Sequence, residues 1–136
     1  MTLTININSF SYRRGIPKDT TGNGGGFVFD CRGIYNPGRI DGYKTLSGLD
    51  QEVREFLETQ SSIAEFLTPV YQLVDSTVDN YLSRDFAHLQ VNFGCTGGQH
   101  RSVYAAEQTA KHLKTKYPDV VVRIEHTNKE HWKKTL

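Results

Sequence analysis

Several residue types that bind or attack phosphate lie close together in the segment GCTGGQHRS, residues 94–102. A β-prone run precedes this segment, and a helix is expected to follow it. Gly97 and Gly98 allow positive φ and a close approach of the backbone to a ligand. The start of the helix presents unpaired N–H groups and partial positive charge, which attract an anion. The corner also holds three side-chain donors, His100, Arg101 and Ser102, so we expect it to bind phosphate rather than only to turn the chain.

The spacing from Cys95 to Arg101 leaves a second interpretation open. Five residues separate the two, as in the loop of cysteine-dependent phosphatases, where a thiolate attacks phosphorus and the arginine holds the equatorial oxygens. Asp30 would then protonate the leaving group. However, Gly94 stands where those phosphatases usually have histidine, and a buried thiol is the commonest fate of a cysteine. Catalysis by Cys95, Arg101 and Asp30 is therefore the alternative to simple binding.

A second group of polar residues lies in the stretch FDCRGIYNPGR, residues 29–39. Asp30 can accept hydrogen bonds from sugar hydroxyls or an amino group. Arg32 can pair with a phosphate or with Asp30, and the second possibility would make the pair purely structural. Asn36 lies in the loop that follows.

Hydrophobic periodicity and turn residues predict the elements that position these groups. We expect strands at 2–10, 27–30, 88–94 and 119–126, of which 27–30 is predicted to be buried. Helices are expected at about 50–59, from residue 62 onward, and at 101–116. Pro69 is expected to kink or split the second of these helices, and Leu73 is expected to lie on its apolar face. This order predicts a single compact α/β domain, residues 1–126, with a mainly parallel sheet and flanking helices, and a loosely ordered basic tail, 127–136. Ligands of such sheets bind beyond the carboxyl ends of the strands, where Asp30 and Cys95 are expected.

Composition indicates a globular protein without a strong global charge. The 136 residues include 37% hydrophobic and 23% charged residues, and the formal net charge is +1. No apolar run is long enough to span a bilayer, and two cysteines do not make a disulfide framework, so we expect a cytoplasmic protein. No P-loop motif, metal site or cofactor site is predicted. RNA binding would depend on two local basic clusters, which are Arg13 and Arg14, and Lys129, Lys133 and Lys134. The alternative is that these residues lie in a solvent-exposed loop and tail that bind no RNA.

Four stretches in this order resemble the C-terminal domain of the RapZ RNase adapter family: SFSYRRGIP, FVFDCRGIYNPG, LSGLDQEV and GCTGGQHRSVYAAEQ. The resemblance implies an α/β fold similar to a part of phosphofructokinase, and binding of glucosamine-6-phosphate. It also implies small regulatory RNA and a ribonuclease as partners, with oligomerisation left open. Carried over to this sequence, the implied sugar-phosphate pocket comprises Asp30, Arg32, Asn36, Thr96, Gly97, Gly98, His100 and Arg101.

The chain departs from the family pattern at two points. Gly38 stands where the family motif has histidine, so any role of that side chain is lost. The P-loop domain of full-length members is absent from this sequence, and we expect a stand-alone or truncated form. The resulting prediction is a non-catalytic binding or regulatory domain for a phosphorylated amino sugar, with RNA binding as a further possibility.

Overall fold

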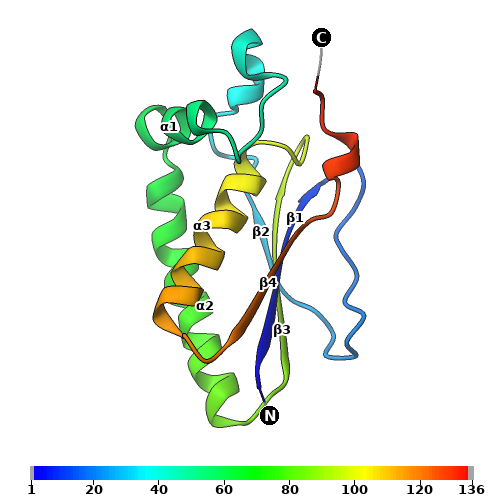
Figure 1. Ribbon diagram of the computed structural model, residues 1–136, viewed down its shortest axis with the longest axis vertical. Coiled ribbons are helices and arrows are strands. Elements are labelled where there is room, and N and C mark those ends of the chain that lie inside the picture. The colour runs from blue at the N-terminus through cyan, green and yellow to red at the C-terminus, as the bar shows by residue number, and fades with distance from the viewer. Residues whose placement is uncertain (1, 135–136) are drawn as a thin grey trace.

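The computed structural model describes residues 2–134. Within them, four strands form one parallel sheet in the order β2-β3-β1-β4, and Figure 1 shows the α-helices gathered against one face of it. The elements are β1 (Thr4–Ser11), β2 (Gly26–Asp30), α1 (Gln51–Gln60), α2 (Ile63–Ser83), β3 (His88–Cys95), α3 (Arg101–Lys116) and β4 (Val121–His126). Short 3-10 helices are η1 (Pro37–Arg39), η2 (Asp41–Tyr43) and η3 (Lys129–His131). The predicted single α/β domain with a parallel sheet and flanking helices is confirmed, while the domain boundary at residue 126 stays a prediction.

The two faces of the sheet differ because successive side chains of a strand point to opposite sides. On β1, Ile5 and Ile7 are fully buried in the core under the helices. Their neighbours Asn6 and Asn8 lie on the other face, which the helices leave open. The same alternation on β3 places Leu89 and Val91 in the core and His88 and Gln90 on the open face.

The second helix, α2, continues through Pro69 as one element, so the predicted split does not occur. Its buried stripe runs past the proline through Leu67, Val70, Val74 and Val78, and this packing holds the helix together. Leu73 was expected on the same stripe, but that prediction is wrong because its side chain is 55% exposed.

The prediction of a buried strand at 27–30 is also wrong in part, because β2 lies at the edge of the sheet. Within the described residues it pairs with β3 alone, and Val28 on its open side is 42% exposed. On its other side, Phe29 stacks on Phe93 of the core with ring centroids 5.4 Å apart. The strand is therefore partly buried on its helix-facing side, through Phe27 and Phe29, and exposed on the other.

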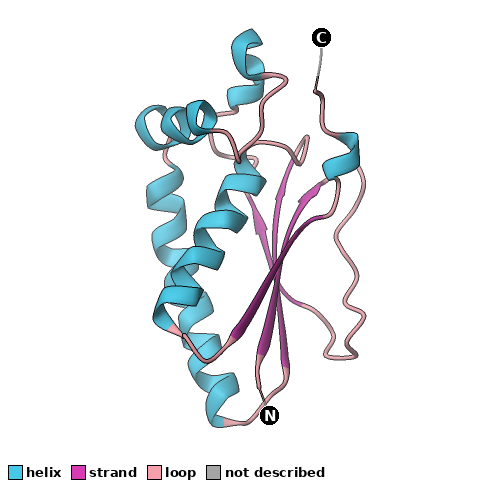
Figure 2. Cartoon of the chain, viewed as in Figure 1, coloured by secondary structure: helices cyan, strands magenta, loops and turns pink. Residues whose placement is uncertain are grey.

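The carboxyl ends of the four strands point to the same end of the molecule. Figure 2 shows loops and short helical turns gathered beyond them. These include the loop after β2, the corner between β3 and α3, and the segment after β4. The parallel fold thus brings together stretches that the sequence separates widely.

Candidate anion-binding site

The corner between β3 and α3 is a tight turn in which the two glycines have different roles. Gly98 has φ +66°, and a Cβ there would lie 2.8 Å from the Ser11 nitrogen on β1. Positive φ and this close packing both require glycine. Gly97 has ordinary φ, and a Cβ there would meet nothing within 4 Å. The predicted need for positive φ therefore holds for Gly98 and not for Gly97.

A pocket of about 290 Å³ opens beside this corner. Its cationic side chains come from four separate segments: Arg13, Lys44, Arg101 and Lys133. The other residues that line it are Asn36, Gly38, Cys95, Thr96, Gly97, Gln99 and His100. None of the lining residues is a carboxylate, but the Lys44 ammonium is paired with the exposed Asp41 carboxylate at 2.7 Å. The excess of positive charge still suits the pocket to an anion.

Arg101 is more deeply placed than a side chain that only clamps a ligand. Its side chain is buried, and the residue is 4% exposed. Its Nη1 donates hydrogen bonds to the backbone carbonyls of Arg32 (2.9 Å) and Ile34 (2.8 Å). Its Nε is buried without a hydrogen-bond partner among the described residues. Arg101 therefore fixes the loop after β2, and it also contributes positive charge to the pocket wall.

His100 is held as a neutral group at the pocket. Burial lowers its pKa from the usual value of 6.5, and the positive charge of Arg101 acts in the same direction. Its Nε2 lies 2.8 Å from the Tyr43 carbonyl oxygen, so Nε2–H is the donor and Nδ1 is left as an acceptor. A Cβ on Gly38 would lie 3.3 Å from that Nδ1. The absence of a side chain at residue 38 thus leaves the imidazole edge open to the pocket.

Asp30 and Arg32, which the resemblance places in the pocket, do not line it. Arg32 donates from Nε and Nη2 to both Asp30 carboxylate oxygens, at 2.8 to 3.1 Å, and its backbone N–H donates to Oδ1. These hydrogen bonds lower the pKa of Asp30. The Arg32 guanidinium also lies 3.8 Å from the centre of the Tyr12 ring. The structure therefore shows these two residues paired with each other at the start of the loop after β2.

The other predicted residues divide between the pocket and the core. Asn36 lines the pocket, and its Oδ1 accepts a hydrogen bond from the Gly38 nitrogen. Cys95 also borders it but is only 2% exposed, and its thiol donates to the Ser102 hydroxyl at 3.1 Å. Ser102 is fully buried on the core side of the corner and does not line the pocket.

Sequence reasoning missed four contributors to the pocket, of which Arg13 was assigned only to a basic cluster for RNA. Lys44 is the only lysine in the loop 31–49, and that was the one available signal. Gln99 occupies a position in the corner to which the motif assigns no chemistry. Lys133 was assigned to a loosely ordered tail, yet Trp132 and Lys133 are hydrogen-bonded to the corner. Residues 135 and 136 of the predicted tail lie outside the described part of the chain.

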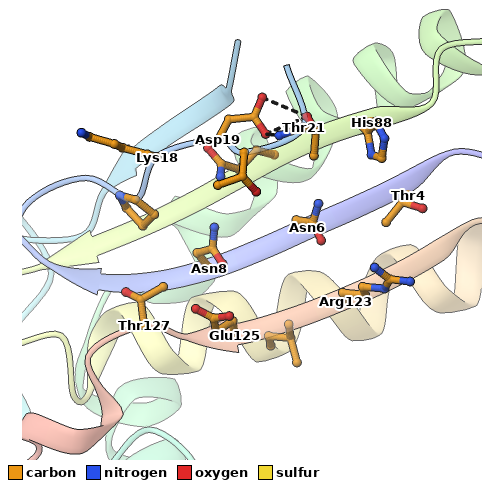
Figure 3. Close-up of a pocket in the computed structure, with 14 residues that line it drawn as sticks. Thr4, Asn6, Asn8, Lys18, Asp19, Thr21, His88, Arg123, Glu125 and Thr127 are labelled. Atoms are coloured by element: carbon orange, nitrogen blue, oxygen red, sulfur yellow. Dashed lines mark hydrogen bonds between the residues drawn. The ribbon is translucent and has the colours of Figure 1, made fainter. Parts of the chain in front are cut away.

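A larger pocket, of about 720 Å³, lies on the open face of the sheet below the loop 17–21 (Figure 3). Asn6 and Asn8 rise from the strand in its centre, with Arg123 and Glu125 on one side of them and Lys18 and Asp19 above. Its lining carries both charge signs, so it offers an anion no preference comparable with that of the smaller pocket.

Residues 2–134 contain no group of three or more metal-ligating side chains arranged to hold an ion. None of the helices in this part of the chain has the length and apolarity needed to cross a membrane.

Comparison with known proteins assigns the family. The model of the RapZ C-terminal domain matches residues 3–130. The chain belongs to the RapZ C-terminal domain family. Three relatives named "Nucleotide-binding protein" are 39% identical over 114 residues in Endomicrobium trichonymphae, 35% over 127 in Pseudoalteromonas atlantica and 36% over 129 in Fervidobacterium nodosum. These matches cover 84%, 93% and 95% of this chain, but 38%, 43% and 43% of the relatives. The chain thus spans about two fifths of the length of the curated relatives it matches, and the predicted family membership is confirmed.

Proposed function

We propose that this RapZ C-terminal domain is a non-catalytic binding domain that holds a phosphorylated sugar of the glucosamine-6-phosphate type in the smaller pocket. The observation that carries the proposal is the set of four cationic side chains around a glycine-containing helix start, without a carboxylate in the lining. Phosphate is doubly charged near neutral pH and accepts several charge-assisted hydrogen bonds. The neutral imidazole of His100 supplies an acceptor for an amino or hydroxyl group of the sugar.

The phosphatase alternative has no support in the arrangement of its three groups. The Cys95 thiol is almost fully buried and donates to a hydroxyl. Asp30 is paired with Arg32, and Arg101 holds two backbone carbonyls. Each group is thus engaged with the protein, and we propose binding without turnover.

The test is a calorimetric titration with glucosamine-6-phosphate, accompanied by amide NMR shifts and an assay of released phosphate. Glucosamine and inorganic phosphate are the matched controls. We expect saturable binding with shifts at Gly97, Lys44 and His100, weaker binding of both controls, and no phosphate release. Equal binding of glucosamine and the phosphorylated sugar would contradict a phosphate site, and release of phosphate that depends on Cys95 would establish an enzyme.

RNA is proposed as a further partner because the two predicted basic clusters meet at this pocket. Arg13 and Lys133 both line it, and the Ser11 nitrogen donates to the Asn128 side chain at 2.7 Å, which joins the two segments. We expect RNA binding that weakens with rising salt and with Arg13→Ala/Arg14→Ala, measured by filter binding across a salt series. Binding that is insensitive to both would remove RNA from the proposal.

A further inference from the structure

The segment after β4 is attached to the corner by side-chain hydrogen bonds rather than lying free. The Trp132 indole N–H donates to the Gly98 carbonyl at 2.8 Å. The Lys133 nitrogen donates to the Gln99 Oε1 at 2.9 Å, and the Gln99 Nε2 donates back to the Lys133 carbonyl at 2.9 Å. Gly98 and Gln99 of the corner therefore bind the segment after β4 directly through hydrogen bonds.

Gln99 joins three segments at one point. Besides Lys133, its Nε2 donates to the carbonyls of Leu46 (2.8 Å) and Lys44 (3.3 Å) in the loop before α1. The residue is 7% exposed, so these partners replace water for a buried amide. Both Lys44 and Lys133 line the pocket, and the Lys44 ammonium lies 2.7 Å from an Asp41 carboxylate oxygen. The Gln99 side chain thus fixes the backbone of two residues that line the pocket, Lys44 and Lys133.

We propose that the C-terminal segment 127–133 is a wall of the sugar-phosphate site, in which Lys133 binds the ligand and Gln99 is the positioning residue that places Lys133 and Lys44. This inference rests on the proposed function and assigns to that site a segment that the sequence places in an RNA-binding tail. The Lys133 ammonium would donate to a phosphate oxygen. Gln99 would act through the backbone of residues 44 and 133 without needing to touch the ligand.

The molecule carries its own reporter of this arrangement. Trp132 is the only tryptophan of the chain, so its fluorescence reports the environment of the segment alone. We would titrate the full chain and its variants with glucosamine-6-phosphate, reading affinity by calorimetry and segment docking by Trp132 emission. Lys133→Ala is expected to weaken binding about ten-fold, because one charge-assisted hydrogen bond is lost. Lys133→Arg should restore affinity to within about three-fold, since it keeps the charge.

Gln99→Leu separates positioning from direct binding. We expect a red-shifted Trp132 emission before any ligand is added, and a loss of affinity at least as large as that of Lys133→Ala. The matched control is Lys114→Ala, which removes the same charge from the exposed last turn of α3 and should leave both affinity and emission unchanged. Urea unfolding of each variant identifies any that has simply lost its fold.

The outcomes separate the two proposals. If the wild-type chain does not bind, the proposed function fails and this inference fails with it. If the wild-type chain binds but Lys133→Ala and Gln99→Leu bind as tightly as the wild type, the proposed pocket stands. The proposal that segment 127–133 forms a wall of the site is then wrong. A loss of affinity in Lys114→Ala equal to that in Lys133→Ala would also overturn it, because the effect would then be a general one of net charge.

Discussion

The almost fully buried Arg101 side chain donates hydrogen bonds to two backbone carbonyls of the loop after β2. Replacing it with methionine keeps much of the volume but leaves the Arg32 and Ile34 carbonyls without their donor. We expect Arg101→Met to lower the free energy of unfolding by about 2–4 kcal/mol, measured by urea denaturation. The matched control is Arg32→Met, whose charge is largely exposed and should cost less than about 1 kcal/mol. Equal losses in both variants would show that the buried carbonyls do not depend on Arg101.

The role of Arg101 shows which part of the site the sequence could predict. Residue types and spacing correctly brought the glycines, His100 and Arg101 to one corner. They did not reveal that Arg101 holds backbone carbonyls, because the path of the loop after β2 depends on tertiary packing. The Asp30–Arg32 pair was an open alternative for the same reason: two residues apart in sequence, they can face each other or a ligand.

His100 makes folding stability depend on pH. Because burial lowers its pKa in the folded state, the unfolded chain binds the proton more tightly. The stabilisation is complete above the unfolded value of about 6.5 and is lost progressively as pH falls below it. We expect the urea concentration at the unfolding midpoint to decrease as the pH is lowered from about 7.5 to about 5. In His100→Gln this decrease should be smaller. The exposed His131→Gln serves as the control, and a pH profile unchanged by His100→Gln would contradict the assignment.

At the scale of elements, the turn from β3 to α3 depends on one of two adjacent glycines. Gly98→Ala would force positive φ on a residue with a side chain and bring its Cβ against the Ser11 nitrogen of β1. We expect a loss of about 2 kcal/mol or more in thermal or urea unfolding. Gly97→Ala meets no atom within 4 Å and should change stability by less than about 1 kcal/mol. Similar losses in both variants would mean that the turn does not pack on β1 as described.

The elements that sequence patterns predicted correctly are those whose pattern and packing agree. Residues 101–116 follow helical spacing and form α3 with those bounds. The prediction that Pro69 could split α2 is wrong because packing of the buried stripe stabilises the helix by more than the missing hydrogen bond costs. Pro69 itself lies at an exposed position of α2. The prediction that the strand FVFD is buried fails in part because a run of apolar residues does not distinguish a central strand from an edge strand.

At the scale of the whole molecule, β4 completes the sheet on one side of the central strand β1. Removing it would leave β1 with an unpaired edge and uncover Ile5 and Ile7. We expect a chain that ends at Tyr117 to lack a dispersed amide NMR spectrum, whereas a chain that ends at Asn128 retains it. A folded shorter chain would show that β4 is dispensable to the core.

The strand order β2-β3-β1-β4 also has a consequence for how the protein is made. The strand that leaves the ribosome first is central, and its two neighbours lie 84 and 117 residues further along the chain. At a synthesis rate of roughly 10 residues per second, the last neighbour of β1 is completed about ten seconds after β1 itself. Until β3 is synthesised, the core-facing side of β1, with Ile5 and Ile7, has no partner strand and is exposed to other nascent chains. The nascent domain is therefore a natural client for chaperones that shield extended hydrophobic segments, and its yield should depend on them more than its final stability does.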